Sequence, residues 1–195
     1  MKRHGIFPIT LILLGFNAWA TPQRLLPEDS RVEFTVEQMG VPVTGEFKRF
    51  EAVVDFDAKK PEKSSARLCI ETASVSTGND EADAVARDAD WLDQAHSPYA
   101  TFKSGSIRDL GGGRLEAAGT LTIRNKPRDI VVRFDSTEQT GGKTVLTSEF
   151  VIRRSEFGIG GGVWNESGAV SEEVPIKVRL ALVQGQSAFR SCQFK

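Results

Sequence analysis

The sequence contains few of the side chains from which most catalytic and metal sites are built. Its 195 residues include two histidines, two cysteines and a single tyrosine. His4 lies in the basic start of the chain, so His96 is the one histidine left for a folded domain. One imidazole cannot build a multi-histidine site, and we expect no metal. A serine–histidine–aspartate triad would have to use His96, which we expect to be exposed beside Pro98.

Long hydrophobic runs are also lacking. The apolar run 6–16 is shorter than the roughly 20 residues that span a bilayer, and no later run approaches that length. It follows a basic start and precedes Ala-Trp-Ala at 18–20, the small-x-small pattern that signal peptidase reads. We therefore expect residues 1–20 to be a cleaved signal peptide and residues 21–195 to form one exported domain. A membrane anchor is the alternative.

The chain lacks an excess of either charge, because 25 Lys and Arg face 26 Asp and Glu. This balance does not favour binding to nucleic acid or to an anionic membrane, and we expect neither as a partner. The acidic residues between Asp80 and Asp93 do not have EF-hand spacing, so we interpret them as a solvated helix face. The glycine-rich stretch 158–168 lacks the arrangement of a phosphate loop and is interpreted as a loop at the mouth of the fold.

The two cysteines, Cys69 and Cys192, are far apart and form no CxxC motif, which argues against redox catalysis. Cys69 shares its predicted strand face with Arg67 and Glu71, so it should point outward. An exported chain is exposed to oxidising conditions, and a disulfide between the two cysteines is the favoured interpretation. Two unrelated thiols are the alternative.

What the sequence does have is alternation at period two, which is clearest in residues 114–134. One face of this stretch carries Leu115, Ala117, Gly119, Leu121 and Ile123, and then Ile130, Val132 and Phe134 on the way back. This pattern is typical of an antiparallel pair with one buried face. We place the turn at Asn125-Lys126-Pro127, because asparagine tolerates positive φ and proline cannot donate to the ladder.

The same alternation recurs along the chain and predicts about eight strands. One helix is predicted over Asp80–Gln94, where the alternation stops, and Pro98 ends it. Many short strands joined by tight turns indicate a barrel or a sandwich. An eight-stranded barrel can hold one small ligand. The chain has 12 phenylalanines, most of them in or beside predicted strands, and periodicity leaves open whether they fill a core or line a tunnel.

Five motifs in order extend the argument beyond periodicity. They are Val-Thr-Gly-Glu-Phe at 43–47, Thr-Gly-Asn at 77–79 followed by Asp83, Asp-Trp-Leu-Asp at 90–93 followed by Ser-Pro-Tyr-Ala-Thr-Phe-Lys-Ser at 97–104, Gly-Thr-Leu-Thr-Ile-Arg at 119–124, and Arg-Ser-Glu-Phe-Gly-Ile at 154–159. Together, over residues 25–182, they resemble the YceI-like family of periplasmic polyisoprenoid-binding proteins. The chain departs from the family pattern at Val85 and Ala86, where His-Leu is common, and at Asn125, where Gly is common.

The resemblance implies an all-β fold, an eight-stranded antiparallel lipocalin-like barrel with one helix between strands. It implies an interior tunnel that takes a long isoprenoid or other lipid, such as a polyprenyl phosphate or a quinone. The expected place is the periplasm, and the expected role is transport, storage or sequestration. A homodimer is suggested. No cofactor beyond the bound lipid and no stable membrane insertion are expected.

The ligand-binding residues expected on this basis are mostly the inward apolar side chains. They are Phe34, Val36, Phe47, Phe56, Leu68, Ile70, Phe102, Leu121, Ile123, Val132, Phe134, Phe150, Ile152, Phe157 and Trp164. Asn79, Asp83 and Arg154 are the polar candidates near one end of the tunnel. Arg154 would pair either with a phosphate or with Asp83 or Glu156.

Two other classes of function stay open at this point. A structural or interaction barrel would have a filled core and no ligand. An enzyme acting on a lipophilic substrate would need a general acid–base pair in the tunnel, for which Asp83 and Glu156 are the candidates.

Overall fold

A computed structural model describes residues 23–55, 61–162, 164, 168–185 and 192. The predicted signal peptide (1–20) and the predicted lining residue Phe56 lie outside these ranges. The strands are β1 (Gln23–Leu25), β2 (Arg31–Gln38), β3 (Val41–Phe47), β4 (Phe50–Asp55), β5 (Ser65–Glu71), β6 (Val75–Ser76), β7 (Tyr99–Gly111), β8 (Arg114–Ile123), β9 (Lys126–Gln139), β10 (Lys143–Arg153) and β11 (Glu173–Gln184). The helices are α1 (Asp80–Arg87) and the short 3₁₀ turns η1 (Pro27–Asp29), η2 (Pro61–Lys63), η3 (Thr72–Ser74) and η4 (Arg154–Phe157).

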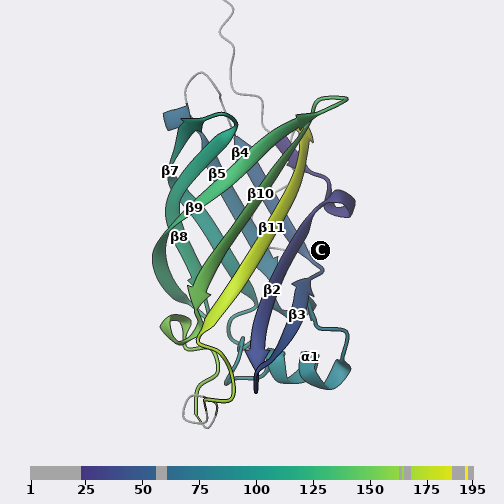
Figure 1. The fold of residues 1–195 in the computed structure, drawn as a ribbon, viewed down its shortest axis with the longest axis vertical. Helices are drawn as coiled ribbons and strands as arrows, with labels where there is room; N and C mark the ends of the chain where they lie inside the picture. Colours follow the sequence, from purple (N-terminus) through teal and green to yellow (C-terminus); the bar gives the residue numbers. More distant parts are fainter. Residues whose placement is uncertain (1–22, 56–60, 163, 165–167, 186–191, 193–195) are drawn as a thin grey trace, which may run out of the picture.

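These strands form one antiparallel sheet that closes on itself as a barrel (Figure 1). The ring runs β1-β4-β5-β7-β8-β9-β10-β11, and β1 closes it by pairing with β11 as well as with β4. β2, β3 and β6 continue the sheet from β11 toward the end where α1 lies. The predicted eight-stranded barrel with one α-helix is therefore confirmed. Three of its eight positions are each divided into two strands: β1 and β2, β3 and β4, and β5 and β6.

Buried serines satisfy backbone groups where these strands are interrupted. Ser30, after η1, donates its hydroxyl to the carbonyl of Leu26 at 2.7 Å and accepts from the amide of Ala181 at 3.0 Å. Ser74, at the end of η3, donates to the carbonyl of Glu71 at 2.6 Å and accepts from the amide of Arg49 at 3.0 Å. At each interruption, the serine side chain thus replaces hydrogen bonds that the strand ladder would have made. Few buried backbone N–H and C=O groups are therefore left without a partner.

The β8–β9 hairpin turns earlier than the sequence predicts. Arg124 and Asn125, at φ 50° and 57°, form a two-residue turn, and β9 already starts at Lys126. Two positive φ values give the strand twist that tight hairpins need. Pro127 pairs with Thr122, one step beyond the residues that flank the turn, so its missing amide falls on the edge of β9 that faces away from β8. That edge must be unpaired for proline to be tolerated there.

The edge beside Pro127 is indeed unpaired, because β9 and β10 separate along their length. They pair only from Lys143–Thr147 to Gln139–Asp135, and no ladder joins them beyond those residues in the described chain. At the point of separation the Ser148 hydroxyl donates to the carbonyl of Arg133 at 2.7 Å. The barrel wall therefore has a seam between β9 and β10.

Helix α1 ends at Arg87, whereas the sequence pattern predicts a helix as far as Gln94. The chain turns back at Asp88, and amides from beyond the helix bond to its last carbonyls: Leu92 to Ala86 at 3.0 Å and Gln94 to Arg87 at 3.1 Å. The reversed segment satisfies the carbonyls that a longer helix would have used. No helix among the described residues is long and apolar enough to cross a membrane.

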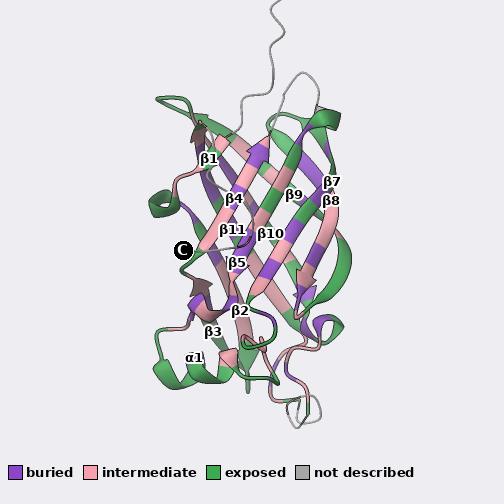
Figure 2. Ribbon diagram, turned by 180° about the vertical axis from the view of Figure 1, so that it is seen from behind, coloured by how far each residue is buried: buried purple, intermediate pink, exposed green. Residues whose placement is uncertain are grey.

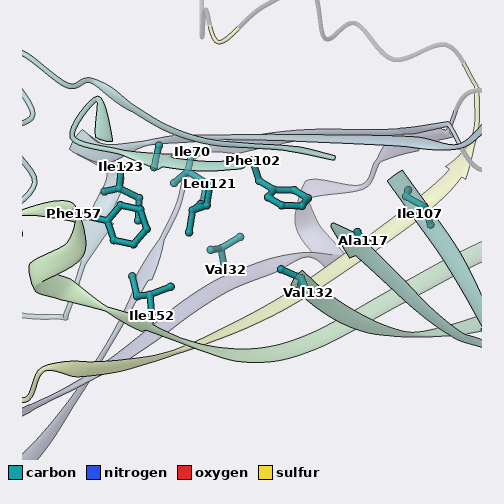
Figure 3. Packing of buried hydrophobic residues seen from close by; sticks show 11 residues of the cluster. Val32, Ile70, Phe102, Ile107, Ala117, Leu121, Ile123, Val132, Ile152 and Phe157 are labelled. Atoms are coloured by element: carbon teal, nitrogen blue, oxygen red, sulfur yellow. The ribbon is translucent and has the colours of Figure 1, made fainter. Parts of the chain in front are cut away.

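The interior is apolar along the whole barrel. Burial alternates along the strands, so that buried bands cross the sheet between exposed ones (Figure 2). Figure 3 shows one cluster of buried side chains, in which Val32, Phe102, Leu121, Val132 and Ile152 come from five strands and point toward one another. A second cluster around Leu115, Leu146 and Leu182 continues the apolar interior.

One buried carboxylate lies on the outer face of the barrel, between two arginines. Glu116 is in register with Arg108 on β7 and with Arg133 on β9, and it bonds to both. Its side chain is 8% exposed, whereas the arginine side chains that cover it are 71% and 77% exposed. Hydrogen bonds from Arg108 and then Arg133 lower the pKa of Glu116 below its ordinary value of 4.5, against the opposing effect of burial.

We predict a pH dependence of stability from Glu116. Because its pKa is lower in the folded state, its stabilising contribution is fully present above pH 4.5 and is lost as the pH falls through the folded value. The variant Glu116→Gln lacks this titration, so its deficit in unfolding free energy should shrink as the pH drops below 4.5. Urea unfolding at several pH values measures it. Glu149→Gln is the control, because Glu149 forms only an exposed pair with Lys177 at 3.7 Å. A deficit independent of pH would contradict the prediction.

Candidate ligand cavity

An apolar cavity of about 350 Å³ runs through the barrel. Side chains from the strands on all sides line it, and α1 and the segment after it line it at one end. Its volume lies within the range of roughly 300–1,000 Å³ that is usual for small-molecule sites. The barrel therefore encloses space rather than a completely filled core.

Most of the sequence-predicted apolar residues line this cavity. They are Phe34, Val36, Phe47, Leu68, Ile70, Phe102, Leu121, Ile123, Val132, Phe134, Phe150, Ile152 and Trp164. Phe157, the last residue of η4, does not line it: it is 1% exposed and packs in the core. That the lining residues bind a ligand stays a prediction.

Several lining residues were not among the predicted ones. Val32, Leu115, Ala117, Ile130, Val178 and Leu180 belong to the same inward faces and carry the same alternation signal. Ile107 is inward because a register shift between Ser104 and Ser106 changes the parity of β7, which no local pattern reveals. Ala82, Val85, Ala86, Trp91 and Leu92 line the cavity from α1 and the turn after it, where alternation gives no signal.

Two tryptophans line the cavity near the α1 end. The rings of Trp91 and Trp164 lie 5.6 Å apart between centroids in an edge-to-face arrangement. The indole nitrogen of Trp91 is buried without a hydrogen-bond partner among the described residues. The carbonyl of Asp90 accepts from the amides of Gly160 and Gly161 at 2.7 and 3.1 Å, which holds the Trp91 segment to the glycine-rich loop.

Arg154 also lines the cavity, but its guanidinium is fully engaged by the chain itself. It is 3% exposed, and its five N–H groups donate to the backbone carbonyls of Ile159, Gly160, Trp164, Val170 and Ser171 at 2.9–3.5 Å. A guanidinium has five donors, so none is left for a phosphate. The suggested pairing with Asp83 or Glu156 is wrong for the described structure, in which Arg154 shapes the loop that follows η4.

A structural reason explains the glycine at position 160 in the glycine-rich loop. A Cβ atom there would collide with the Arg154 guanidinium, and the residue has φ +69°. Glycine therefore permits both the turn and the close approach of the cation. The loop is built around a buried arginine and has no phosphate-loop geometry.

The other two polar candidates position α1 and do not line the cavity. Asn79 is the N-cap of α1, and its side-chain oxygen accepts from the amides of Glu81 and Ala82, each at 3.0 Å. Asp83 accepts from the amide and the hydroxyl of Thr77 at 2.6 and 2.7 Å. Burial raises the pKa of Asp83, but the Thr77 bonds and the charges of Arg87 and Lys48 outweigh it and lower the pKa overall.

We expect Asn79→Ala to destabilise the protein by about 1 kcal/mol, because two amides at the start of α1 lose their acceptor. Urea unfolding measures the change. Asn79→Asp keeps an acceptor oxygen at the same place and should stay close to the wild type. Equal midpoints for Asn79→Ala and the wild type would show that the cap contributes nothing.

The described residues contain no cluster of three potential metal ligands. Cys69 and Cys192 form a disulfide, as predicted. Cys69 does not line the cavity, unlike its neighbours Leu68 and Ile70 on β5, so it lies on the outer face. Its side chain is nevertheless completely buried.

Comparison with known proteins agrees with this architecture. The model of the YceI-like domain matches residues 24–182. "Protein YceI" of Escherichia coli is 30% identical over 159 residues, covering 78% of this chain and 81% of that protein. The crystal structure of Burkholderia cenocepacia BcnA superposes with a TM-score of 0.77 at 34% identity, over 80% of this chain and 98% of BcnA. A polyisoprenoid-binding domain from Saccharophagus degradans shares the fold, with a TM-score of 0.67 at 17% identity over 84% and 98% of the two chains.

Proposed function

Because the chain belongs to the YceI-like family, we propose that it is an exported, periplasmic protein that holds a long isoprenoid-type lipid inside its barrel. The ligand would be a polyprenyl phosphate or a quinone-like molecule, held for transport, storage or sequestration. The polyisoprenoid-binding domain of Saccharophagus degradans, which has the same fold, supports this class of ligand. The N-terminal signal pattern supports export.

The observation that carries the proposal is the apolar cavity of about 350 Å³. Each CH₂ group moved from water into such a site contributes about 0.8 kcal/mol. A dozen buried carbons would supply about 10 kcal/mol before ordering costs, which suffices for tight binding. The few polar side chains on the wall, and the engagement of Arg154 by backbone carbonyls, favour a ligand recognised mainly by its hydrocarbon.

The two competing functions have less support. A structural barrel with a filled core does not account for an enclosed apolar space. An enzyme would need its acid–base pair in the cavity, yet neither Asp83 nor Glu156 lines it. The lowered pKa of Asp83 also keeps it ionised, which suits a structural acceptor better than a proton donor at neutral pH. The homodimer stays a prediction of the resemblance.

Native mass spectrometry of the protein isolated from its own periplasm without detergent tests the proposal. We expect a stoichiometric adduct that releases a prenyl chain on organic extraction. If the protein is isolated free of ligand, a short-chain ubiquinone analogue is titrated in, with the fluorescence of Trp91 and Trp164 as the readout. Apo protein that also fails to bind the analogue would overturn the proposal.

A further inference from the structure

The lining of the cavity continues past the end of the barrel onto the β2–β3 hairpin. Val36 and Gln38 on β2 line the cavity, and Val43 lines it from β3. Val41 is the register partner of Gln38, so it lies on the same inward face, one step closer to the tip. Val41 is 61% exposed and Met39, at the tip, is 82% exposed.

Helix α1 supplies another apolar part of the same rim. Val85 lines the cavity and is also 40% exposed, and we therefore infer a mouth of the cavity at this residue. Figure 1 shows α1 beside β2 and β3 at the same end of the barrel. Met39, Val41 and Val85, which we call the apolar rim, thus lie beside the mouth. Exposed apolar side chains at the same end of the barrel as the mouth are candidates for an interaction surface.

The conformation of Met39 is a second sign that the rim has a purpose. Met39 and Gly40 form the turn at φ 51° and 81°. The first position of such a turn favours Asn, Asp or Gly, and a long side chain at positive φ is strained. Arg124 takes a similar φ of 50° in the β8–β9 turn, so what distinguishes Met39 is an apolar side chain at an exposed turn position that usually carries a polar residue or glycine.

The hairpin tip is also held firmly in place. The amide of Met39 donates to the carbonyl of Ala169 at 2.7 Å, and the amide of Ser171 donates to the carbonyl of Glu37 at 2.8 Å. The amide of Glu37 in turn donates to the Ser171 hydroxyl at 3.0 Å. The segment shaped by Arg154 therefore braces the edge of β2 and fixes the apolar rim in an exposed position.

The charges around the mouth restrict what the rim can contact. Asp80, Glu81 and Asp88 are exposed on and next to α1, and Glu37 is exposed on β2; these acidic groups outnumber the cations Arg87 and Lys48 near the same helix. These acidic groups would be repelled by an anionic surface. The apolar rim favours contact with a surface in which hydrocarbon is accessible. A neutral lipid surface satisfies both conditions.

We propose that the apolar rim docks the cavity mouth reversibly on a zwitterionic lipid bilayer, so that the apolar ligand passes between membrane and barrel without crossing water. This inference rests on the proposed lipid-binding function. Contact through three side chains is shallow and differs from stable insertion. Anionic lipids should weaken the contact, and moderate salt should leave it nearly unchanged at a zwitterionic surface.

The test is sedimentation of the full chain with phosphatidylcholine vesicles. The variant is Met39→Asn with Val41→Thr, which removes the apolar rim of the hairpin while Asn suits the positive φ. We expect vesicle partitioning to fall about tenfold or more, because two apolar anchors are lost. The control is Val131→Thr with Val151→Thr, which replaces two residues that are 58% and 54% exposed elsewhere on the barrel. The control should partition like the wild type.

Titration of the short-chain ubiquinone analogue in solution separates this inference from the proposed function. The rim variant should keep its affinity for the analogue but lose its binding to vesicles. Absence of wild-type binding to phosphatidylcholine, equal losses in the rim and control variants, or tighter binding with added phosphatidylglycerol would each overturn the docking inference. If the analogue binds to no form of the protein, the proposed function fails, and the docking inference, which rests on it, loses its basis.

Discussion

Loss of the Cys69–Cys192 disulfide should lower the free energy of unfolding by roughly 4–5 kcal/mol, the value that the chain-entropy model gives for a loop of this size. The two cysteines are 123 positions apart, so the bond closes a loop that contains most of the domain. This loop restricts the chain when the protein is unfolded. The variant to make is Cys192→Ser. Cys192 is half-buried, so its replacement disturbs little else, whereas Cys69 is completely buried and stays in place as a small apolar side chain.

Urea unfolding under oxidising and reducing conditions measures this contribution. Dithiothreitol should bring the wild type down to the stability of Cys192→Ser and leave the variant unchanged. A wild type whose midpoint is the same with and without reductant would show that the bond adds nothing to stability. A reduced wild type more stable than the variant would show that the serine itself is destabilising.

The disulfide also shows how far sequence reasoning reaches in this protein. With two cysteines and a predicted export signal, a single disulfide was the favoured interpretation, and alternation places Cys69 on the face away from Leu68 and Ile70. The complete burial of Cys69 could not be predicted in the same way. Burial of an outward residue depends on what covers the outer face, and a strand pattern carries no information about that.

Alternation predicts the strands and the face that each residue takes, but it leaves a barrel and a sandwich open, and the resemblance to the YceI-like family is what favoured the barrel. The register shift in β7 shows the limit, since a bulge changes the parity and makes Ile107 an inward residue. The seam between β9 and β10 is a similar case. Alternation says nothing about which strands are neighbours, and Pro127 marks an unpaired edge only after the turn at Arg124–Asn125 is known.

The polar part of the site was harder to predict than the apolar wall. Arg154 uses backbone carbonyls as its partners, and these come from a loop whose path depends on glycine conformations such as that of Gly160. A search for charged side-chain partners could not find them. The contribution of Trp91 was missed because the turn after α1 has no regular period.

Replacement of Ala117 by phenylalanine should sharply weaken ligand binding. Ala117 is inward on β8, 2% exposed, and lies between Ile107 and Val132 in the wall of the cavity. A phenyl ring there would occupy space that hydrocarbon would otherwise fill. If it displaces about three CH₂ groups at ~0.8 kcal/mol each, the affinity should fall about 50-fold. Fluorescence titration with the short-chain ubiquinone analogue measures the loss.

The adjacent residue provides a matched control for Ala117→Phe. Ala118 has the same side chain but lies on the outer face of β8, in register with Ser106 and Val131. Ala118→Phe adds the same ring to the same strand without entering the cavity, so its affinity should equal that of the wild type. Urea unfolding shows whether both variants keep the fold. A folded Ala117→Phe variant that binds as tightly as the wild type would mean that the ligand does not pass this point of the barrel. An equal loss of affinity in both variants would mean that the ring acts by disturbing the barrel wall and not by filling the cavity.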